Sequence, residues 1–127
     1  MPLSPARSST SEQSFRLRPS TIPEAGIGVF ILHSVRKGTY LRLRPKEQIS
    51  RILHRSEVHP DLMCYGISVG RGRYAFPPEF NHMHMAWFVN HSESPNVEWR
   101  PDGFYAQRLI REGEELFFDY GTLSEYF

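Results

Sequence analysis

Short runs in which apolar residues alternate with basic ones begin soon after the first dozen residues. "FRLR" (Phe15–Arg18) and "YLRLR" (Tyr40–Arg44) follow this pattern, which is typical of half-buried strands. "GVFIL" (Gly28–Leu32) is instead a continuous apolar run with β-branched and aromatic members, so we expect a more deeply buried strand there. "RKG" (Arg36–Gly38) lies between two of these runs and predicts a turn.

Further strand-like runs in the second half are joined by turn sequences. "YGISV" (Tyr65–Val69) and "RYAF" (Arg73–Phe76) flank the turn sequence "GRG", which predicts a hairpin. A second hairpin is expected from Asn96–Arg100 and Phe104–Leu109, because the "PDG" between them contains Asp-Gly, a strong hairpin turn signal. "REGEE" then turns the chain into a last strand, Leu116–Tyr120.

Helical patterns are scarce in the sequence. Short helices are expected at Lys46–Leu53 and Glu79–Val89, and no repeat has the period of a solenoid or propeller. Residues 1–13 are rich in Ser and Pro and are expected to form a flexible tail. The sequence therefore predicts one mainly β domain at residues 14–127, with many short strands and one or two short helices.

Composition narrows the class of protein. The chain has 127 residues, 39% apolar and 23% charged, as expected of one globular domain. A net charge of +1 neither favours nor excludes nucleic-acid binding, because a local patch can hide in a small total. Cys64 is the only cysteine, which excludes an internal disulfide and a multi-cysteine zinc site.

Cysteine usage and apolar run length also bear on location. With one cysteine and no signal-peptide pattern, the chain is expected to be intracellular, cytoplasmic or nuclear, and not secreted. No apolar run approaches the roughly 18–20 residues of a membrane helix, so no membrane partner is expected.

The first candidate binding feature is "AGIGVF" (Ala25–Phe30). Gly26 and Gly28 stand just before the buried strand, where glycine lets the backbone approach a ligand closely. The third glycine and the following helix of a dinucleotide fingerprint are missing, so a nicotinamide enzyme is not indicated. Taken alone, the two glycines are also explained by a tight turn.

Histidines are candidate metal ligands, and a metal-dependent hydrolase using His82, His84 and His91 is one alternative. His82 and His84 would share a face on a strand, but the region is expected to be helical, where residues two apart do not face each other. We therefore expect no metal. Cys64 has no adjacent motif with a histidine and an acid, so it is not expected to act as a nucleophile.

Polar residues follow apolar runs at two further places. "WFVNHSESPN" places Asn90 and His91 directly after an aromatic-rich run, and "GEELFFDYG" ends an apolar strand with Asp119 and Tyr120. A tyrosine hydroxyl at a strand end could point into a pocket, although tyrosines more often pack with the hydroxyl at the surface.

These stretches, in this order, resemble the SET domain of protein-lysine methyltransferases. The matching motifs are Gly-x-Gly at 26–28, Asn90-His91-Ser92-x-x-Pro95-Asn96, and Glu114-Glu115-Leu116 followed by Asp119-Tyr120. The resemblance extends over roughly Phe15–Tyr126. It implies a SET fold of several short-stranded sheets, in which the Asn-His-Ser segment passes through a loop near the end of the chain as a C-terminal pseudoknot.

The resemblance also implies a cofactor and roles for particular residues. The cofactor would be S-adenosyl-L-methionine, and the residues implied to bind it are Gly26, Ile27, Gly28, Asn90, His91, Tyr120 and Tyr126. Phe30 would pack beneath this site, and Tyr120 would be the catalytic tyrosine between cofactor and substrate lysine. The implied substrate channel has walls from Trp99, Phe104 and Phe118, with Trp87 and Tyr126 as further candidates.

The sequence departs from the family at three places. A second active-site tyrosine, on an early strand in many members, is missing: "LRLRPKEQI" stands there with Arg44, and Tyr40 and Tyr65 are the candidate substitutes. Trp99 stands where the family often has the Phe or Tyr that limits methylation, which predicts low methylation multiplicity or a different channel geometry. The cysteine-rich zinc segment after many SET domains is absent, so "LSEYF" or a second subunit would close the pocket, and a homodimer is plausible.

The resemblance therefore predicts an S-adenosylmethionine-dependent protein-lysine N-methyltransferase. Its partner would be a protein with a target lysine, a histone or another cellular protein, and no direct nucleic-acid binding is expected. The alternative is a catalytically inactive SET-fold module that binds a protein partner, and the missing early tyrosine favours it. Retention of the Gly-x-Gly, Asn-His-Ser and late tyrosine motifs together favours cofactor binding.

Overall fold

Four small β-sheets form the framework of the molecule. The computed structural model describes residues 13–44 and 50–126, and the side chains up to residue 123. The sheets are formed by β1 (Phe15–Pro19) with β2 (Ile27–Ile31); by β3 (Tyr40–Leu41), β9 (Gly103–Ala106) and β8 (Val97–Arg100); by β4 (Arg51–His54), β6 (Arg73–Phe76) and β5 (Ile67–Gly70); and by β7 (Asn90–His91) with β10 (Phe117–Phe118). The expectation of a mainly β fold with several short-stranded sheets is confirmed.

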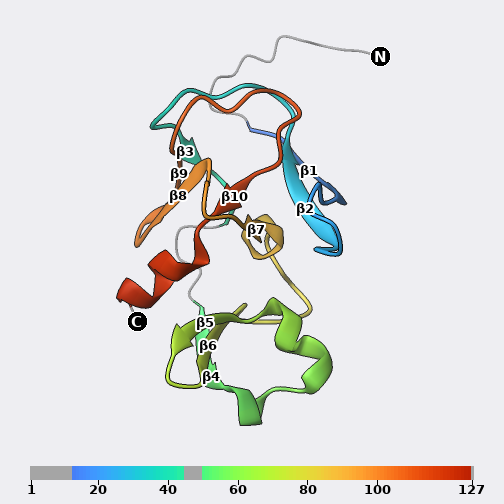
Figure 1. Cartoon of the computed structure of the whole chain (residues 1–127), viewed down its shortest axis with the longest axis vertical. Coiled ribbons are helices and arrows are strands. Elements are labelled where there is room, and N and C mark those ends of the chain that lie inside the picture. The colour runs from blue at the N-terminus through green and yellow to red at the C-terminus, as the bar shows by residue number, and fades with distance from the viewer. Residues whose placement is uncertain (1–12, 45–49, 127) are drawn as a thin grey trace.

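The helical turns of the described residues are all of the 3₁₀ type and short. They are η1 (Arg55–Glu57), η2 (Pro60–Tyr65), η3 (Met85–Phe88) and η4 (Tyr120–Tyr126). The β4–β6–β5 sheet lies at one end of the long axis, and the other sheets occupy the opposite part, with β7 and β10 near the centre (Figure 1). No helix in the part of the chain that the structure describes is long and apolar enough to cross a membrane.

Most predicted strands are present, with small shifts at their ends. β1 and β2 pair antiparallel with Phe15 opposite Ile31, and the two predicted hairpins are β5–β6 and β8–β9. The strand expected at Tyr40–Arg44 is shorter, since only Tyr40–Leu41 pairs with β9. The Leu43 N–H donates to the Leu41 carbonyl at 2.9 Å, which turns the backbone away from the sheet.

The two helix predictions are wrong over most of their described length. Residues 51–53 of the expected helix Lys46–Leu53 belong to β4, which pairs antiparallel with β6; residues 45–49 lie outside the described part. Within Glu79–Val89 only η3 is helical, because the Ala86 N–H donates to the Leu43 carbonyl at 3.2 Å. In both places, hydrogen bonds to distant segments override the local helical pattern.

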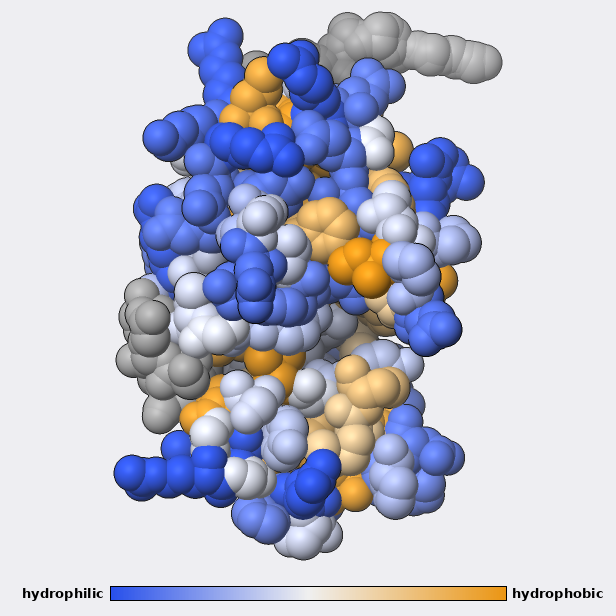
Figure 2. All heavy atoms as spheres, viewed as in Figure 1, coloured by the Kyte–Doolittle hydropathy of each residue, from blue (hydrophilic) through white to orange (hydrophobic). Residues whose placement is uncertain are grey.

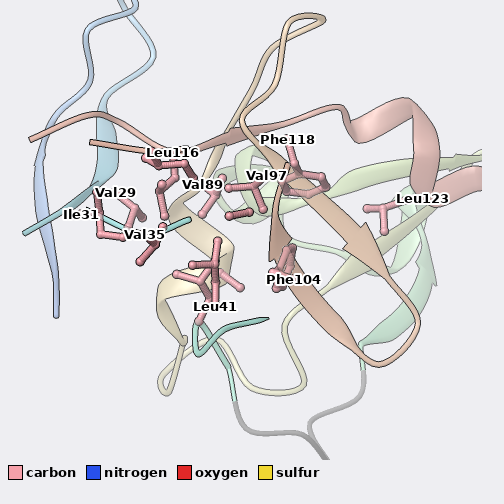
Figure 3. Packing of buried hydrophobic residues seen from close by; sticks show 14 of the residues in the cluster. Val29, Ile31, Val35, Leu41, Val89, Val97, Phe104, Leu116, Phe118 and Leu123 are labelled. Carbon is pink, nitrogen blue, oxygen red and sulfur yellow. The ribbon is translucent and has the colours of Figure 1, made fainter. Parts of the chain in front are cut away.

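The apolar core lies between β2 and the β8–β9 hairpin and is closed by β10. Val29 and Ile31 of β2 are fully buried, and Leu116 and Phe118 lie along the same row of side chains (Figure 3). The core positions the segments that contain the sequence motifs, because residues 90–91 pair in parallel with residues 117–118. The Asn-His-Ser motif and the Asp-Tyr motif are therefore neighbours in space.

Candidate active site

Glu115 is a buried carboxylate at the centre of the motif residues. Its side chain is 4% exposed, and both oxygens accept hydrogen bonds. Oε1 accepts from the N–H and hydroxyl of Thr21, at 2.7 and 2.6 Å, and Oε2 accepts from the Ser20 hydroxyl at 2.8 Å and the Asn90 amide at 3.1 Å. The carboxylate thus ties the β1–β2 turn to β7.

The charge of Glu115 is stabilised by neutral donors. Burial raises the pKa of the carboxyl, but the hydrogen bonds from Thr21, Ser20 and Asn90 outweigh it and hold the pKa below the ordinary glutamate value. Asn90 also donates to the Ile27 carbonyl at 3.1 Å. The amide of Asn90 therefore fixes the edge of β2 beside the Gly-x-Gly segment.

Glycine is favoured at the two positions of the Gly-x-Gly motif for different structural reasons. A Cβ on Gly28 would overlap the carboxylate of Glu115 and approach the Asn90 amide, so no side chain fits there. Gly26 has a φ of 79° and open space where a Cβ would stand. No neighbouring side chain therefore covers this side of its backbone. Ile27 between them is 44% exposed. This edge can be approached from outside by a ligand.

Asn96 is a second buried polar anchor, 2% exposed. Its amide donates to the Glu115 carbonyl at 2.9 Å, and its side-chain oxygen accepts the Phe117 N–H at 2.8 Å. These bonds satisfy backbone groups on both sides of Leu116, as a neighbouring strand would. The Pro-Asn of the sequence motif therefore holds the last strand in place.

His91 and Tyr120 are joined directly across the β7–β10 pair. His91 Nδ1 accepts the Tyr120 N–H at 3.0 Å, so the proton of the neutral ring is on Nε2. The two ring centroids are 5.2 Å apart. The His91 side chain remains 42% exposed, which leaves its outer nitrogen and ring face open to a ligand.

The Tyr120 hydroxyl is the most perturbed group of the site. It donates to the Val89 carbonyl at 2.6 Å, and burial raises the pKa of Tyr120 to about 12. The hydroxyl therefore keeps its proton at physiological pH, and that proton is engaged with Val89. The lone pairs of the hydroxyl oxygen can still accept hydrogen bonds.

An aromatic cavity adjoins Tyr120. Phe118, whose ring centroid is 4.9 Å from that of Tyr120, is one wall, and the other aromatic walls are Trp87, Trp99 and Phe104. The cavity volume is about 40 Å³. A single water requires about 10–15 Å³ by this measure, so the space is narrow. Figure 2 shows apolar surface along the middle of one face, where the β4–β6–β5 sheet meets the rest.

The structure brings together most of the residues singled out from the sequence. Asn90, His91 and Tyr120 form one connected group, with Gly28 held against Glu115 beside it. Trp99, Phe104 and Phe118 share the cavity with Trp87. Phe30 is buried and pairs with Glu115 across an isolated bridge. The side chain of Tyr126 lies outside the described part.

Several residues of the site were not found from the sequence. Ser20 and Thr21 fix Glu115, and the Val89 carbonyl accepts the Tyr120 hydroxyl; nothing in the local sequence marks these groups. Arg44, which the sequence places near the position of the family's early tyrosine, lines the cavity. Among the described residues, no three His, Cys, Asp or Glu side chains gather as a metal site requires.

Comparison with known proteins identifies the family. The model of the SET domain matches residues 26–121, so the chain belongs to the SET-domain family, a family of methyltransferases, and the resemblance seen in the sequence is confirmed. A search of curated proteins found no match.

Solved structures agree with this fold. The matches comprise 195 chains, and one is the crystal structure of a Plasmodium falciparum protein described as a candidate histone methyltransferase. It is 18% identical, the alignment covers 85% of this chain and 97% of that one, and the TM-score is 0.54. At this identity the likeness shows a shared fold.

Proposed function

We propose that this protein is an S-adenosylmethionine-dependent protein-lysine N-methyltransferase. One observation carries the proposal: the ring of Tyr120 packs against Phe118, a wall of a narrow aromatic cavity, while its backbone N–H is bonded to His91 on the exposed edge of β7. A cavity for a lysine side chain and an open edge for a cofactor are thus neighbours. The acceptor would be a protein lysine, and histones are one candidate substrate.

The residues present suit the implied cofactor. The bare backbone at Gly26, the exposed Ile27 and the exposed ring of His91 offer a surface that a nucleoside and an amino-acid group can approach. Gly26–Gly28, Asn90 and His91 would hold it. When bound, S-adenosylmethionine supplies a methyl group on a positively charged sulfur, which a neutral amine can take by in-line displacement.

The cavity residues would favour the neutral form of the lysine amine and orient it. Free lysine has a pKa near 10.4, so its ammonium must lose a proton before it can act as a nucleophile. The apolar walls formed by Trp87, Trp99, Phe104 and Phe118 disfavour the charged form by desolvation, and water at the mouth can take the proton. The same walls align the side chain, and such orientation can contribute several kcal/mol.

Tyr120 has a positioning role at the reacting atoms. Because its proton is donated to the Val89 carbonyl, the hydroxyl oxygen presents lone pairs to weak C–H donors such as a polarised methyl group. Its pKa of about 12 excludes the phenolate as a general base near neutral pH. The tyrosine therefore orients and does not remove a proton.

Calorimetric titration of the purified chain tests the proposal first. S-adenosylmethionine and its demethylated product are titrated separately, and saturable binding near one cofactor per chain is expected. Transfer of labelled methyl groups to core histones and to a lysine peptide library then tests the activity. Absence of binding by the folded chain would overturn the cofactor assignment and favour the inactive, partner-binding module.

A further inference from the structure

Strand β1 is an edge strand whose outer side pairs with no strand among the residues that the structure describes. It pairs antiparallel with β2 on its other side. All its residues except Phe15 are exposed, and the β1–β2 pair lies at the outer side of the molecule (Figure 1). A further strand can therefore approach β1 from outside.

The even-numbered residues along β1 direct their backbone groups toward β2. The Ser14 carbonyl accepts the Leu32 N–H at 3.1 Å, and the Ser20 N–H donates to the Gly26 carbonyl at 2.8 Å. Hydrogen-bonded and non-bonded residue pairs alternate along antiparallel strands. The register is regular from residue 15 to residue 19, so the even-numbered residues between Ser14 and Ser20 also bond β2.

The odd-numbered residues of β1 therefore direct their backbone groups to the outer edge. Phe15 and Leu17 each offer an N–H and a carbonyl there, whereas Pro19, which has no N–H, offers a carbonyl alone. A proline at this place limits the length of any strand that can pair with the edge. The edge thus suits a short extended segment.

The side chains of β1 give this edge a positive face and an apolar face. Arg16 and Arg18 are both exposed, and the guanidinium carbon of Arg18 lies 5.8 Å from the ring centroid of Phe30, the residue opposite Arg16. Neither arginine has an ion-pair partner among the described residues. Leu17 points to the opposite face and is 40% exposed.

We propose that the outer edge of β1 binds an extended segment of a partner protein in which acidic and apolar residues alternate. Main-chain hydrogen bonds to Phe15 and Leu17 would supply affinity. An apolar side chain beside Leu17 and carboxylates beside Arg16 and Arg18 would supply specificity. The inference goes beyond the proposed methyl transfer and does not depend on it, because this binding requires neither cofactor nor turnover.

A second copy of the same edge is a poorer partner. Two β1 strands paired antiparallel about Leu17 would place Arg16 of each strand opposite Arg18 of the other, and like charges directly opposite each other are destabilising. Residues 13–44 contain six arginines or lysines and one acidic residue, Glu24. This part of the chain therefore favours an acidic partner.

Fluorescence anisotropy of labelled peptides on the full chain tests the proposal. The probes are short acetylated peptides in which Glu alternates with Val, Ile or Leu. Saturable binding is expected at low salt, with weaker binding as the salt concentration rises. The same peptides with Lys in place of Glu should not bind. Failure of every Glu peptide to bind the folded chain would overturn the proposal.

Charge reversal on β1 tests the specificity. Arg16→Glu with Arg18→Glu should weaken binding of the Glu peptides at least about tenfold and allow the Lys peptides to bind. Arg36→Glu with Lys37→Glu, at exposed positions outside β1, makes the same change in net charge and should leave binding of the Glu peptides within about twofold. Equal losses in the two double variants would show attraction by net charge alone and overturn the proposal. Arg16→Gln with Arg18→Gln serves if the reversed variant does not fold.

The backbone pairing has its own readout. The apolar residue opposite Leu17 would exchange both hydrogen bonds with it in an antiparallel pair, so N-methylation of the apolar residues of the peptide should abolish binding. N-methylation of the Glu residues, whose N–H groups would face solvent, should not. Bound peptide should also slow amide hydrogen exchange at Phe15 and Leu17.

Two results would assign the edge differently. Equal effects of the two methylation patterns would mean that the peptide does not pair as a strand. A concentration-dependent dimer in sedimentation, with the Phe15 and Leu17 amides already protected from exchange, would show that a second copy occupies the edge. Either result would overturn the proposal.

Discussion

The carboxylate of Glu115 occupies the space that a side chain on Gly28 would need. Glu115 is 4% exposed and accepts hydrogen bonds from Ser20, Thr21 and Asn90. The glycine of the first motif and the glutamate of the last motif therefore fit each other. The Gly-x-Gly motif and the Glu-Glu-Leu motif, far apart in the sequence, therefore pack directly against each other.

Gly28→Ala should destabilise the fold. The new methyl group would overlap the Glu115 carboxylate and displace it from its donors, and overpacking of this kind costs about 1–3 kcal/mol, with lost hydrogen bonds in addition. Gly26→Ala is the matched control, because it meets only the strain of a φ of 79° and open space. Chemical denaturation measures both variants. Equal losses at the two positions would contradict the fit between Gly28 and Glu115.

Glu115→Gln should remove a pH-dependent part of the stability. The pKa of Glu115 is lower in the folded chain than its ordinary value, so its contribution is present above about pH 4.3 and falls as the pH drops through the folded pKa. At pH 7 the variant should lose about 2–3 kcal/mol, because the amide turns a donor toward the donors of Ser20 or Asn90. Unfolding measured from pH 7 to pH 3 should show this difference shrinking.

The control for Glu115 is its neighbour. Hydrogen bonding to Arg108 lowers the pKa of Glu114 as well, but the Glu114 side chain is 30% exposed in an ion pair at 2.9 Å. Glu114→Gln should therefore cost about 1 kcal/mol or less. A larger loss at position 114 than at 115 would show that burial does not set the importance of these two carboxylates.

Much of the fold follows from local patterns, and the exceptions have a common cause. Alternation and turn residues correctly predict β6 and both hairpins, because side-chain periodicity reports which face is buried. The helix expected through residues 51–53 fails because β4 pairs with β6, some twenty residues away. A segment whose partner is distant cannot be assigned from its own propensity.

The candidate site, like the fold, could be predicted from the sequence only in part. The motifs locate Asn90, His91 and Tyr120, since each stands at the end of an apolar run. The burial of Glu115 is not predictable, because a glutamate is ordinarily exposed and its donors come from residues 20, 21 and 90. Arg44 lines the aromatic cavity directly after a backbone turn at Leu43. Tertiary contacts, and not residue types, decide these two roles.

Tyr120→Phe should greatly reduce methyl transfer while leaving cofactor affinity nearly unchanged. The ring packing against Phe118 and His91 is retained, but the oxygen that we propose to lie beside the reacting atoms is lost, and a loss of about 10²-fold in kcat is expected. Single-turnover transfer and calorimetry measure the two properties. Tyr105→Phe is the control, because the Tyr105 hydroxyl donates to Asp102 at 2.7 Å. Full activity of the Tyr120 variant would refute its assigned role.

His91→Ala should weaken cofactor binding itself. The substitution removes the exposed ring and leaves the Tyr120 N–H without the acceptor that now lies 3.0 Å away, so we expect at least tenfold weaker binding, as loss of one hydrogen bond to a ligand typically causes. Titration with the demethylated product measures this without turnover. His59→Ala, at the exposed N-cap of η2, should bind normally. Unchanged affinity of the His91 variant would remove this residue from the cofactor site.

Trp99 should limit how many methyl groups one lysine receives. Its indole is a wall of a cavity of only about 40 Å³, and each added methyl group enlarges the amine that must rotate there. We expect mainly monomethylated product from the wild type and more di- and trimethylated product from Trp99→Ala, which removes most of that wall. Tyr105→Phe on neighbouring β9 should leave the product distribution unchanged. Mass spectra of the peptide products decide the matter: trimethylation by the wild type would mean that Trp99 leaves room for three methyl groups and that another wall sets the limit.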